Sequence, residues 1–437
     1  MIKWPTSWSP AVLCAVISVS CGVNESTEQE SLELQPTSAE AQTGPSHGST
    51  AQVAMAFKTQ PGSMCILHGS GADGNTSGLA LFAAENGIVR FYQEAPETQV
   101  PDAANFPQLD CQAPDGTSLP TQTIDPETSA RLAAADDAEQ MALPIQPPLT
   151  GDLLSYSQRE LLSLGQPPRP DPNNAPPEQL AKWREIVSTP KRIISPKTVL
   201  NPTVSMTHSF DNSWSGIITY QPPTLAAYDW IQATWIVPAV TVAPGVQWGT
   251  AYASLWVGLT GGALAQAGTD QIAMELSGIG YASYNAWIQF FPGPNHVTSL
   301  AVHPDDRIYT EVWVGDSYGN YDVAGGYCWA YIYNTTTGLV WQGNVPVPSG
   351  YMFTGDSAAW ILERPLVGGT NAYLADFYST PMYGTLAYSV DGEYLDINEP
   401  FSEEKWMKST STGNILDTIV HNPLQAGTIS FYWNADH

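Results

Sequence analysis

The chain has 437 residues, a net charge of −27 and only 13% charged residues. Such an acidic chain is a poor partner for nucleic acid, because binding to phosphates requires clustered Lys and Arg side chains. Residues 201–437 hold 20 acidic residues and only four basic ones. A domain with so few cations gains little net positive charge when its carboxylates become protonated, so we expect this part of the chain to tolerate acid.

The first residues resemble an export signal. Lys3 precedes an apolar run at 11–19 that is too short to span a bilayer. We therefore expect residues 1–23 to be a signal peptide and the protein to be secreted. The segment 18–21 also loosely resembles a lipoprotein cleavage site, and lipidation of Cys21 would anchor the protein at the cell surface, which would be its one link to a membrane. Residues 24–53 are rich in Ser, Thr, Glu, Gln and Gly and are predicted to be a disordered tether.

The middle of the chain mixes weak strand signals with helical ones. Residues 54–120 alternate around turn residues and predict a small β unit, in which Cys65 and Cys111 can pair, leaving Cys328 alone in the last domain. Helices are predicted over 126–142, with Asp125 as the N-cap, and over 151–164 and 178–187. We interpret 54–205 as a mixed α/β region that precedes the main domain.

The pattern of apolar and polar residues changes at about residue 209, where helical periodicity stops. Aromatic and β-branched runs then recur between Pro, Gly, Asn and Asp residues. Many short strands separated by turns indicate an antiparallel sandwich or barrel, so we predict an all-β domain over 206–437. The strands are expected at 217–220, 231–237, 253–259, 283–291, 308–314, 327–333, 339–342, 358–363, 372–377 and 428–433.

One predicted strand, 358–363, ends at a carboxylate. Side chains alternate along a strand, so Ala359, Ile361 and Glu363 share one face while Trp360 and Leu362 share the other. A glutamate at this position is either a solvated charge at a strand end or a catalytic acid/base.

Several segments of this domain, taken in order, resemble those of the glutamic peptidase (eqolisin) family. They are 212–216, 233–238, 256–259 followed by 266–268, 284–292, 334–338 and 360–363. The resemblance implies an antiparallel β-sandwich of the concanavalin A-like jelly-roll type and an acid endopeptidase whose catalytic pair is Gln266 and Glu363. It implies no cofactor or metal, and the seven His residues show no metal-binding spacing.

The resemblance also places four residues at the substrate cleft: Trp256, Thr260, Trp287 and Gln289. Two of them depart from the family pattern. Thr260 stands where an acidic residue is often found, and Gln289 stands where the family has Glu. These departures affect the expected substrate preference and working pH.

The paired residue types suit peptide hydrolysis without a nucleophilic side chain. A carboxylate at Glu363 can activate water as general base and return the proton to the leaving nitrogen as general acid. The amide of Gln266 can donate to the developing oxyanion without adding a charge. We expect the two groups to meet across the floor of an open groove that takes protein or peptide substrates.

Five of the basic residues cluster just before the acidic domain. We predict that Lys182, Arg184, Lys191, Arg192 and Lys197 lie across the cleft, so that the region 54–205 acts as an intramolecular inhibitor of a monomeric enzyme. Acid would neutralise the carboxylates, loosen this contact and allow self-cleavage near 199–208.

Two other classes of function remain open at this stage. One is a glycoside hydrolase on a similar jelly roll, in which Glu363 is paired with Glu275 or Glu311. The other is a carbohydrate-binding sandwich without catalytic activity.

Overall fold

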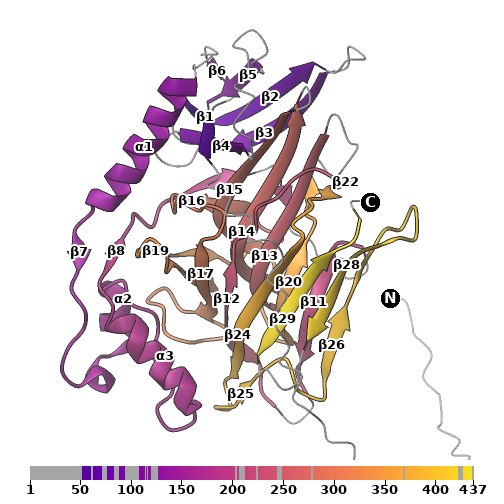
Figure 1. Cartoon of the computed structure of the whole chain (residues 1–437). Coiled ribbons are helices and arrows are strands. Elements are labelled where there is room, and N and C mark those ends of the chain that lie inside the picture. Colours follow the sequence, from indigo (N-terminus) through magenta and orange to yellow (C-terminus); the bar gives the residue numbers. More distant parts are fainter. Residues whose placement is uncertain are drawn as a thin grey trace, which may run out of the picture. The chain divides into compact units, whose positions relative to one another are not determined.

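A computed structural model describes residues 52–60, 63–70, 76–82, 88–93, 108–113, 115, 117–119, 126–201, 204–205, 212–222, 225–243, 249–276, 279–367, 370–421 and 427–435. Within these residues the chain folds around two large sheets, whose strands run mostly antiparallel (Figure 1). The antiparallel β-sandwich predicted for the C-terminal half is therefore confirmed.

The first sheet contains the strand that ends at Glu363. Among the described residues it has 11 strands, and its main path runs β1-β4-β15-β14-β13-β20-β11-β26. Its strands are β1 (Gln52–Lys58), β4 (Ile88–Gln93), β9 (Thr198–Asn201), β11 (Trp214–Tyr220), β13 (Gly249–Gly261), β14 (Ala263–Leu276), β15 (Ile279–Phe291), β16 (Asn295–Thr298), β20 (Ser357–Glu363), β23 (Tyr373–Leu374) and β26 (Ser402–Lys405).

The second sheet also has 11 described strands, along the path β27-β28-β29-β24-β12-β17-β18-β19-β8-β7, with β25 paired to β24. Its strands are β7 (Ile145–Gln146), β8 (Lys191–Ile193), β12 (Tyr228–Ile236), β17 (Arg307–Gly315), β18 (Tyr327–Asn334), β19 (Leu339–Pro346), β24 (Ser379–Ser389), β25 (Tyr394–Leu395), β27 (Met407–Lys408), β28 (Ile415–His421) and β29 (Thr428–Trp433). Both sheets thus take strands from before residue 206.

Alternation along the strands divides each sheet into an inner and an outer face. Trp360 and Leu362 belong to the large core between the two sheets, while Ala359 and Ile361 belong to a separate apolar cluster on the outer face of the first sheet. The predicted sharing of faces along β20 is therefore confirmed, and Glu363 lies on the outer face.

Two smaller sheets and the helices complete the described chain. They are β3 (Thr76–Phe82), β2 (Met64–Ser70), β5 (Gln108–Gln112) and β6 (Ser118–Leu119) in one sheet, β10 (Val204–Ser205), β21 (Leu366–Val367) and β22 (Thr370–Asn371) in another, and α1 (Pro126–Ala142), the 3-10 helix η2 (Leu153–Ser155), α2 (Gln158–Ser163) and α3 (Pro177–Val187). The three helical regions and the Cys65–Cys111 disulfide are as predicted, and Cys328 is a buried free thiol. Of the strands in the predicted β unit, β2, β3, β5 and β6 form a small sheet, whereas β1 and β4 join the first large sheet.

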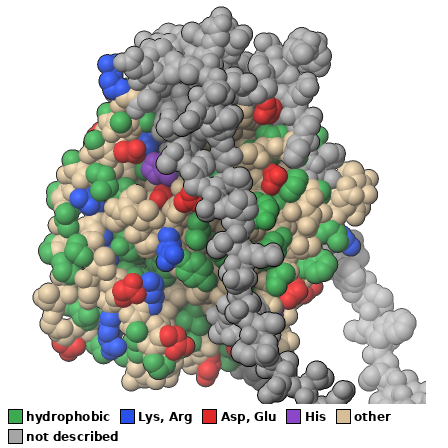
Figure 2. All heavy atoms as spheres, viewed as in Figure 1, with side chains coloured by type: hydrophobic (Ala, Val, Ile, Leu, Met, Phe, Trp, Pro, Cys, Tyr) green, Lys and Arg blue, Asp and Glu red, His purple; other side chains and the backbone are tan. Residues whose placement is uncertain are grey.

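Several predictions fall on residues outside the described ranges: the signal peptide, the Cys21 site, the tether up to residue 51 and the Asp125 cap. The last two tether positions, 52 and 53, belong to β1. Within the described residues no helix is both long and apolar enough to cross a membrane. In Figure 2 charged side chains of both signs lie dispersed among apolar and neutral ones, without a patch of one sign on this face.

Candidate active site

The two proposed catalytic residues lie on the two strands that flank the central strand β13, one on each side. Gln266 of β14 is opposite Gly258, and Glu363 of β20 is opposite Ser254. Directly opposed residues share a face, so the amide and the carboxyl project from the same face of the first sheet. Four residues along β13 and two strand spacings amount to about 15 Å between Cα atoms in a regular sheet. Any joint action therefore needs a substrate lying between the two side chains.

Glu363 is held by an indole from the strand beside it. Trp256 Nε1–H donates to Glu363 Oε2 at 3.0 Å, and both side chains are fully buried. Trp214, the residue opposite Glu363 on β11, packs its ring edge-on against Trp256 with 4.9 Å between ring centroids. The carboxyl thus has a fixed position on the sheet.

Gln266 is held by a second amide. Its Nε2–H donates to Gln289 Oε1 at 2.9 Å, and Gln289 Nε2–H donates in turn to the carbonyl of Gly293 at 2.7 Å. This chain of bonds fixes the orientation of the Gln266 amide. Its Oε1 is buried without a hydrogen-bond partner among the described residues, which is uncommon for a buried polar atom.

Two glycines make room for these side chains. A Cβ at Gly258 would lie 3.0 Å from Gln266 Cβ and 3.0 Å from the Trp256 ring. A Cβ at Gly268, opposite Trp256, would lie 2.2 Å from the carbonyl oxygen of Leu255. The glycines of the Trp-Val-Gly and Gln-Ala-Gly segments are therefore required by close packing around Trp256.

The remaining two predicted cleft residues border the same face. Trp287 of β15 is opposite Gly268 and fully buried. Thr260 is 8% exposed and its hydroxyl lies 2.5 Å from that of Ser357 on β20. The four predicted cleft residues are thus gathered on one face with Gln266 and Glu363.

Sequence reasoning missed one carboxyl on this face. Asp270 is opposite Ser254 on the side away from Glu363, and Ser254 Oγ–H donates to Asp270 Oδ1 at 2.5 Å. Burial raises the pKa of Asp270 to about 7. The signal was present in the sequence, because Asp270 follows Gln266 by four residues and therefore shares its face along β14.

The face is closed in the full chain, whereas an open groove was predicted. Four residues of the N-terminal β unit join one apolar cluster with the tryptophans of the site: Cys65, Val89, Phe91 and Cys111. Phe91 packs edge-on against Tyr281 of β15 with 6.4 Å between centroids, and β4 extends the sheet at Ala282. We call the described residues of 52–142 the cover, because four of them pack in one cluster with Trp256 and Trp287 of this face, on which Gln266 and Glu363 have no exposed surface.

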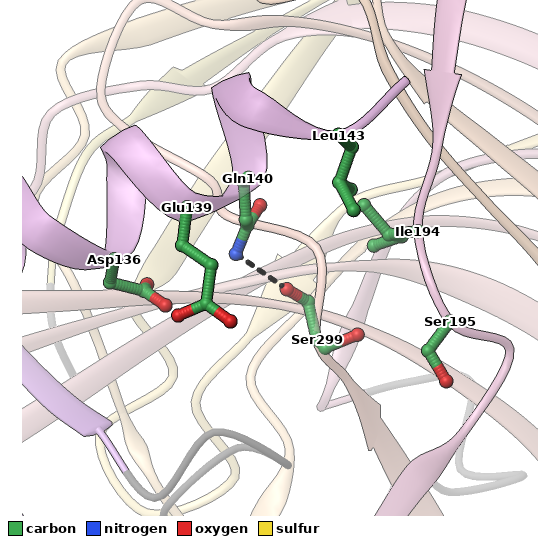
Figure 3. Close-up of a pocket in the computed structure, with 7 residues that line it drawn as sticks. All are labelled: Asp136, Glu139, Gln140, Leu143, Ile194, Ser195 and Ser299. Atoms are coloured by element: carbon green, nitrogen blue, oxygen red, sulfur yellow. Dashed lines mark hydrogen bonds between the residues drawn. The ribbon is translucent and has the colours of Figure 1, made fainter. Parts of the chain in front are cut away.

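Helix α1 attaches the cover to the sandwich. Gln140 Nε2–H donates to the carbonyl of Ser299 at 3.1 Å, and its Oε1 accepts from Ala301 N–H at 3.3 Å (Figure 3). His303 Nε2 lies 3.7 Å from Asp137 Oδ1. Beside these contacts is a hollow of about 300 Å³, which does not border the proposed catalytic pair: Asp136, Glu139, Gln140, Leu143, Ile194, Ser195 and Ser299 line it.

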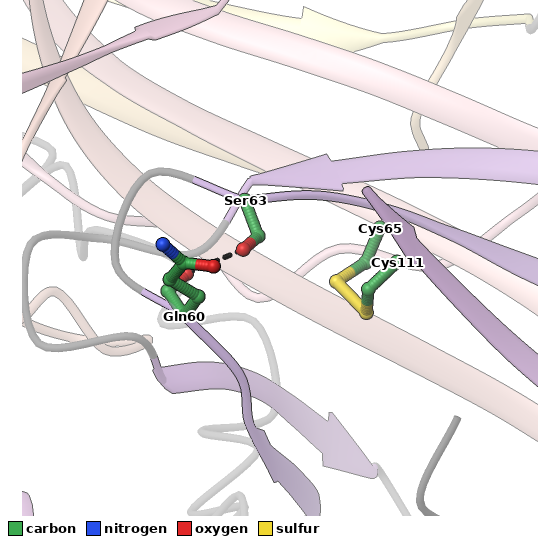
Figure 4. Close-up of a disulfide and its surroundings, with 4 residues drawn as sticks. All are labelled: Gln60, Ser63, Cys65 and Cys111. Carbon is green, nitrogen blue, oxygen red and sulfur yellow. Dashed lines mark hydrogen bonds between the residues drawn. A yellow bond between two sulfur atoms is a disulfide. The ribbon is translucent and has the colours of Figure 1, made fainter. Parts of the chain in front are cut away.

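Inside the cover, the disulfide ties β2 to β5. Cys65 and Cys111 are directly opposed on these strands (Figure 4). Ser63 Oγ–H donates to the carbonyl of Gln60 at 2.5 Å, just before β2. The cover therefore has a covalent cross-link of its own.

The basic cluster does not lie across this face, and that prediction is wrong. Lys191 is buried against Tyr331 and Gln166 on the second sheet, and the carbonyl of Lys197 accepts from Trp341 Nε1–H at 3.3 Å. Lys182 pairs with Glu185 within α3. Lys191 and Lys182 thus have their partners on the second sheet and within helix α3, away from the face that carries Glu363.

The two glutamates considered as partners of Glu363 point elsewhere. Glu311 accepts hydrogen bonds from Trp230 and Tyr309 on the outer face of the second sheet. Glu275 follows Asp270 by an odd number of residues on β14, so its side chain leaves the opposite face of that strand. Neither glutamate can share a cleft with Glu363, which removes the glycosidase pairing.

Comparisons with known proteins give a match to one family model and several similar solved structures. Residues 212–418 match the model of the Peptidase A4 family. A solved scytalido-glutamic peptidase with a transition-state analog inhibitor is similar to this chain at 18% identity and TM-score 0.41, over 52% of this chain and all of that one. SCP-B, a member of the eqolisin family in complex with the tripeptide Ala-Ile-His, gives 18% identity and TM-score 0.39 over 52% of this chain and all of that one. Aspergilloglutamic peptidase from Aspergillus niger gives 22% and 0.34 over 42% of this chain and 99% of that one. A search of curated proteins gives no match.

Proposed function

We propose that this chain, whose residues 212–418 belong to the Peptidase A4 family, cleaves peptide bonds with Glu363 and Gln266 as its catalytic pair. The chain is a glutamic-type peptidase, and the pair, the acidic working range and the export of the protein are our proposal. One observation supports it. The Glu363 carboxyl, bonded to the Trp256 indole, and the Gln266 amide, bonded to Gln289, project from the same face of one sheet.

In the proposed reaction Glu363 and Gln266 act on opposite sides of the scissile peptide. The Glu363 carboxylate takes a proton from water, whose oxygen attacks the carbonyl carbon. A Gln266 N–H donates to the oxygen that becomes negative in the tetrahedral intermediate. Glu363 then returns the proton to the leaving nitrogen, the C–N bond breaks, and a carboxylic acid and an amine are released.

The other residues of the face have supporting parts in this proposal. Trp256 fixes one oxygen of Glu363, and Gln289 orients the Gln266 amide rather than touching the substrate. Trp287 and Thr260 line the path of an extended peptide. Because Gln289 is a neutral amide, its contact with Gln266 keeps the same donors and acceptors at every pH.

The cover provides the proposed intramolecular inhibition. In the full chain the catalytic face is closed by apolar packing, so a peptide must displace the cover before it can bind. The Cys65–Cys111 disulfide fits an oxidising compartment, which favours an exported, monomeric protein. Lipidation at Cys21 remains part of this proposal as a means of attachment to the cell surface.

Two variants with matched controls test the reaction. Glu363→Gln and Gln266→Ala should each lower acid digestion of an unfolded protein substrate by about 10²–10⁴-fold. Gln271→Ala removes a buried amide from the other face of β14, and Glu275→Gln removes a carboxylate from that same opposite face. Both control variants should therefore retain activity.

Digestion at the wild-type rate by either catalytic variant would refute the pair. An acid-treated wild-type chain that releases sugars from polysaccharides but leaves protein intact would refute the peptidase assignment itself.

A further inference from the structure

A second N-terminal segment packs on the side of the sandwich away from Glu363. Residues 145–197, which we call the arm, contain α2, α3 and the strands β7 and β8 (Figure 1). Strand β8 pairs in parallel with β19, where Arg192 is opposite Leu339, and Ile194 enters the core between the sheets. The arm therefore lies before the family-matched region yet is built into its second sheet.

Helix α3 meets the second sheet through a paired amide. Gln179 Nε2–H donates to Gln232 Oε1 and Gln232 Nε2–H donates to Gln179 Oε1, both at 2.9 Å, and both side chains are buried. Gln232 Oε1 also accepts from the Tyr309 hydroxyl at 2.7 Å. Loss of the helix would leave these buried polar groups without their partners.

The arm also supplies a buried cation to this face. Lys191 is 1% exposed, and its Nζ donates to Gln166 Oε1 at 2.7 Å and to the carbonyl of Ile186 at 2.6 Å. It lies 5.5 Å from the centre of the Tyr333 ring and attracts the buried Glu311. The bonds to Gln166 and Ile186 lie within the arm, so the contacts of Lys191 with the sheet are the Tyr331 hydroxyl at 3.4 Å and the Tyr333 ring, and both are lost if the arm leaves.

We infer that the arm is a permanent part of the mature peptidase, docked on the outer face of β12, β17 and β18, and that only the cover is removed on activation. Release of the cover requires hydrolysis of one peptide bond between Ala142 and Ile145, which adds one water. A second hydrolysis in the connection between Asn201 and Asn212 would add another water and separate the arm from the sandwich domain as a chain of its own. The arm would stay bound as the smaller chain. This inference rests on the proposed function only for the step that removes the cover.

Cleavage by a foreign protease tests the inference without using the chain's own activity. Recognition sequences for a site-specific protease are placed between Ala142 and Ile145 and between Asn201 and Asn212 of the full-length Glu363→Gln protein. After both cuts, native mass spectrometry and gel filtration at about 1 μM should find the arm with the sandwich domain at pH 7 and at pH 4. Because no step needs catalysis, the result is independent of whether the peptidase proposal holds.

Variants of the arm show whether the described contacts retain it. Lys191→Met and Gln179→Leu should each increase the amount of free arm at least about 10-fold. Lys182→Met on the exposed side of α3, where the pair with Glu185 lies within the arm, should leave retention unchanged. Should Lys191→Met fail to fold, Gln179→Leu still provides the comparison.

If the unsubstituted arm is found free after cleavage, the inference is overturned, whether the sandwich domain stays folded or precipitates. Equal retention by the two buried variants and the Lys182 control would also overturn the assigned contacts.

Discussion

Substitution of His303 should loosen α1 within a defined pH window. Burial alone would lower the pKa of His303, but its contacts with Asp137 and Asp306 outweigh this and raise it to about 9. The pKa of Asp137 is raised by burial but lowered more by His303 and Arg90, so it ends below its ordinary value. The stabilisation by this pair is therefore fully present between the ordinary pKa of Asp137, 3.8, and that of His303, 6.5. It is lost as pH falls through the lowered pKa of Asp137 or rises through about 9.

The magnitude follows from which partners stay together when α1 leaves. A rise from 6.5 to about 9 corresponds to about 3 kcal/mol for charged His303, shared between two carboxylates. Asp306 remains on the same loop as His303, while Asp137 leaves with α1. The Asp137 side chain is 40% exposed and lies 3.7 Å away, so solvent screening reduces its share to about 1 kcal/mol. His303→Gln should thus increase opening of α1 about fivefold at pH 5–6.

Hydrogen exchange of α1 amides, measured by mass spectrometry in the Glu363→Gln background, reports this opening. Gln140→Ala removes two hydrogen bonds that carry no charge, so it should speed exchange at every pH by a larger factor. His421→Gln, whose imidazole pairs with Glu404 on β26, is the control and should not affect α1. An effect of His303→Gln that is the same at pH 5 and pH 10 would refute the assignment of the charge pair.

Three further outcomes are expected. In thermal unfolding, the Gln289→Glu protein should be as stable as wild type at pH 3 but about 2 kcal/mol less stable at pH 7. At pH 7 a buried carboxylate cannot donate to the Gly293 carbonyl that the Gln289 amide contacts. The Gln112→Glu protein, changed at an exposed residue, should show no such difference. Thermal unfolding of wild type should occur at a higher temperature at pH 4 than at pH 7. Asp270, whose pKa is raised to about 7, accounts for about 3 kcal/mol of this difference, so Asp270→Asn should flatten it. Replacing Cys65 and Cys111 by Ser opens a loop of 46 residues and should cost the cover about 4 kcal/mol, seen as selective proteolysis of residues before 120.

The alternation of side chains correctly predicted the two faces of β20. Both faces of this strand pack against apolar clusters, so the apolar residues on each side identify the cluster that they join. The same rule failed to find β14 over its full length. Its outward residues Gln266 and Asp270 are polar, the inward Thr269 is polar as well, and together with Gly268 they give the segment the composition of a loop. Only the pairing with β13 and β15 on either side explains a strand there. The run 372–377 shows the reverse, since its aromatic residues predicted a strand of six residues, but only Tyr373–Leu374 form one, followed by an isolated bridge between Asp376 and Thr241.

The positions of the N-terminal cations could not be predicted from charge. An excess of acid in the C-terminal domain suggested that Lys191 and its neighbours would lie over the catalytic face. Lys191 is instead satisfied by the carbonyl of Ile186 nearby in the sequence, by the amide of Gln166, and by the rings of Tyr331 and Tyr333 from a strand far along the chain. Sequence gives the sign and number of charges, whereas the partners of a buried charge are fixed only when the elements pack.

The cover and the sandwich respond to acid in opposite directions, and this follows from the signs of two pKa shifts. Asp137 has a lowered pKa, so the contact that it makes with His303 is lost as pH falls. Asp270 and Asp417 in the sandwich have raised pKa values because they are buried, so the folded sandwich holds protons that the unfolded chain releases above pH 4. Acidification therefore weakens the attachment of the cover while it stabilises the domain beneath. In the proposed activation, a single change of pH would favour release of the cover from Glu363 and Gln266 while the sheet that positions them stays folded.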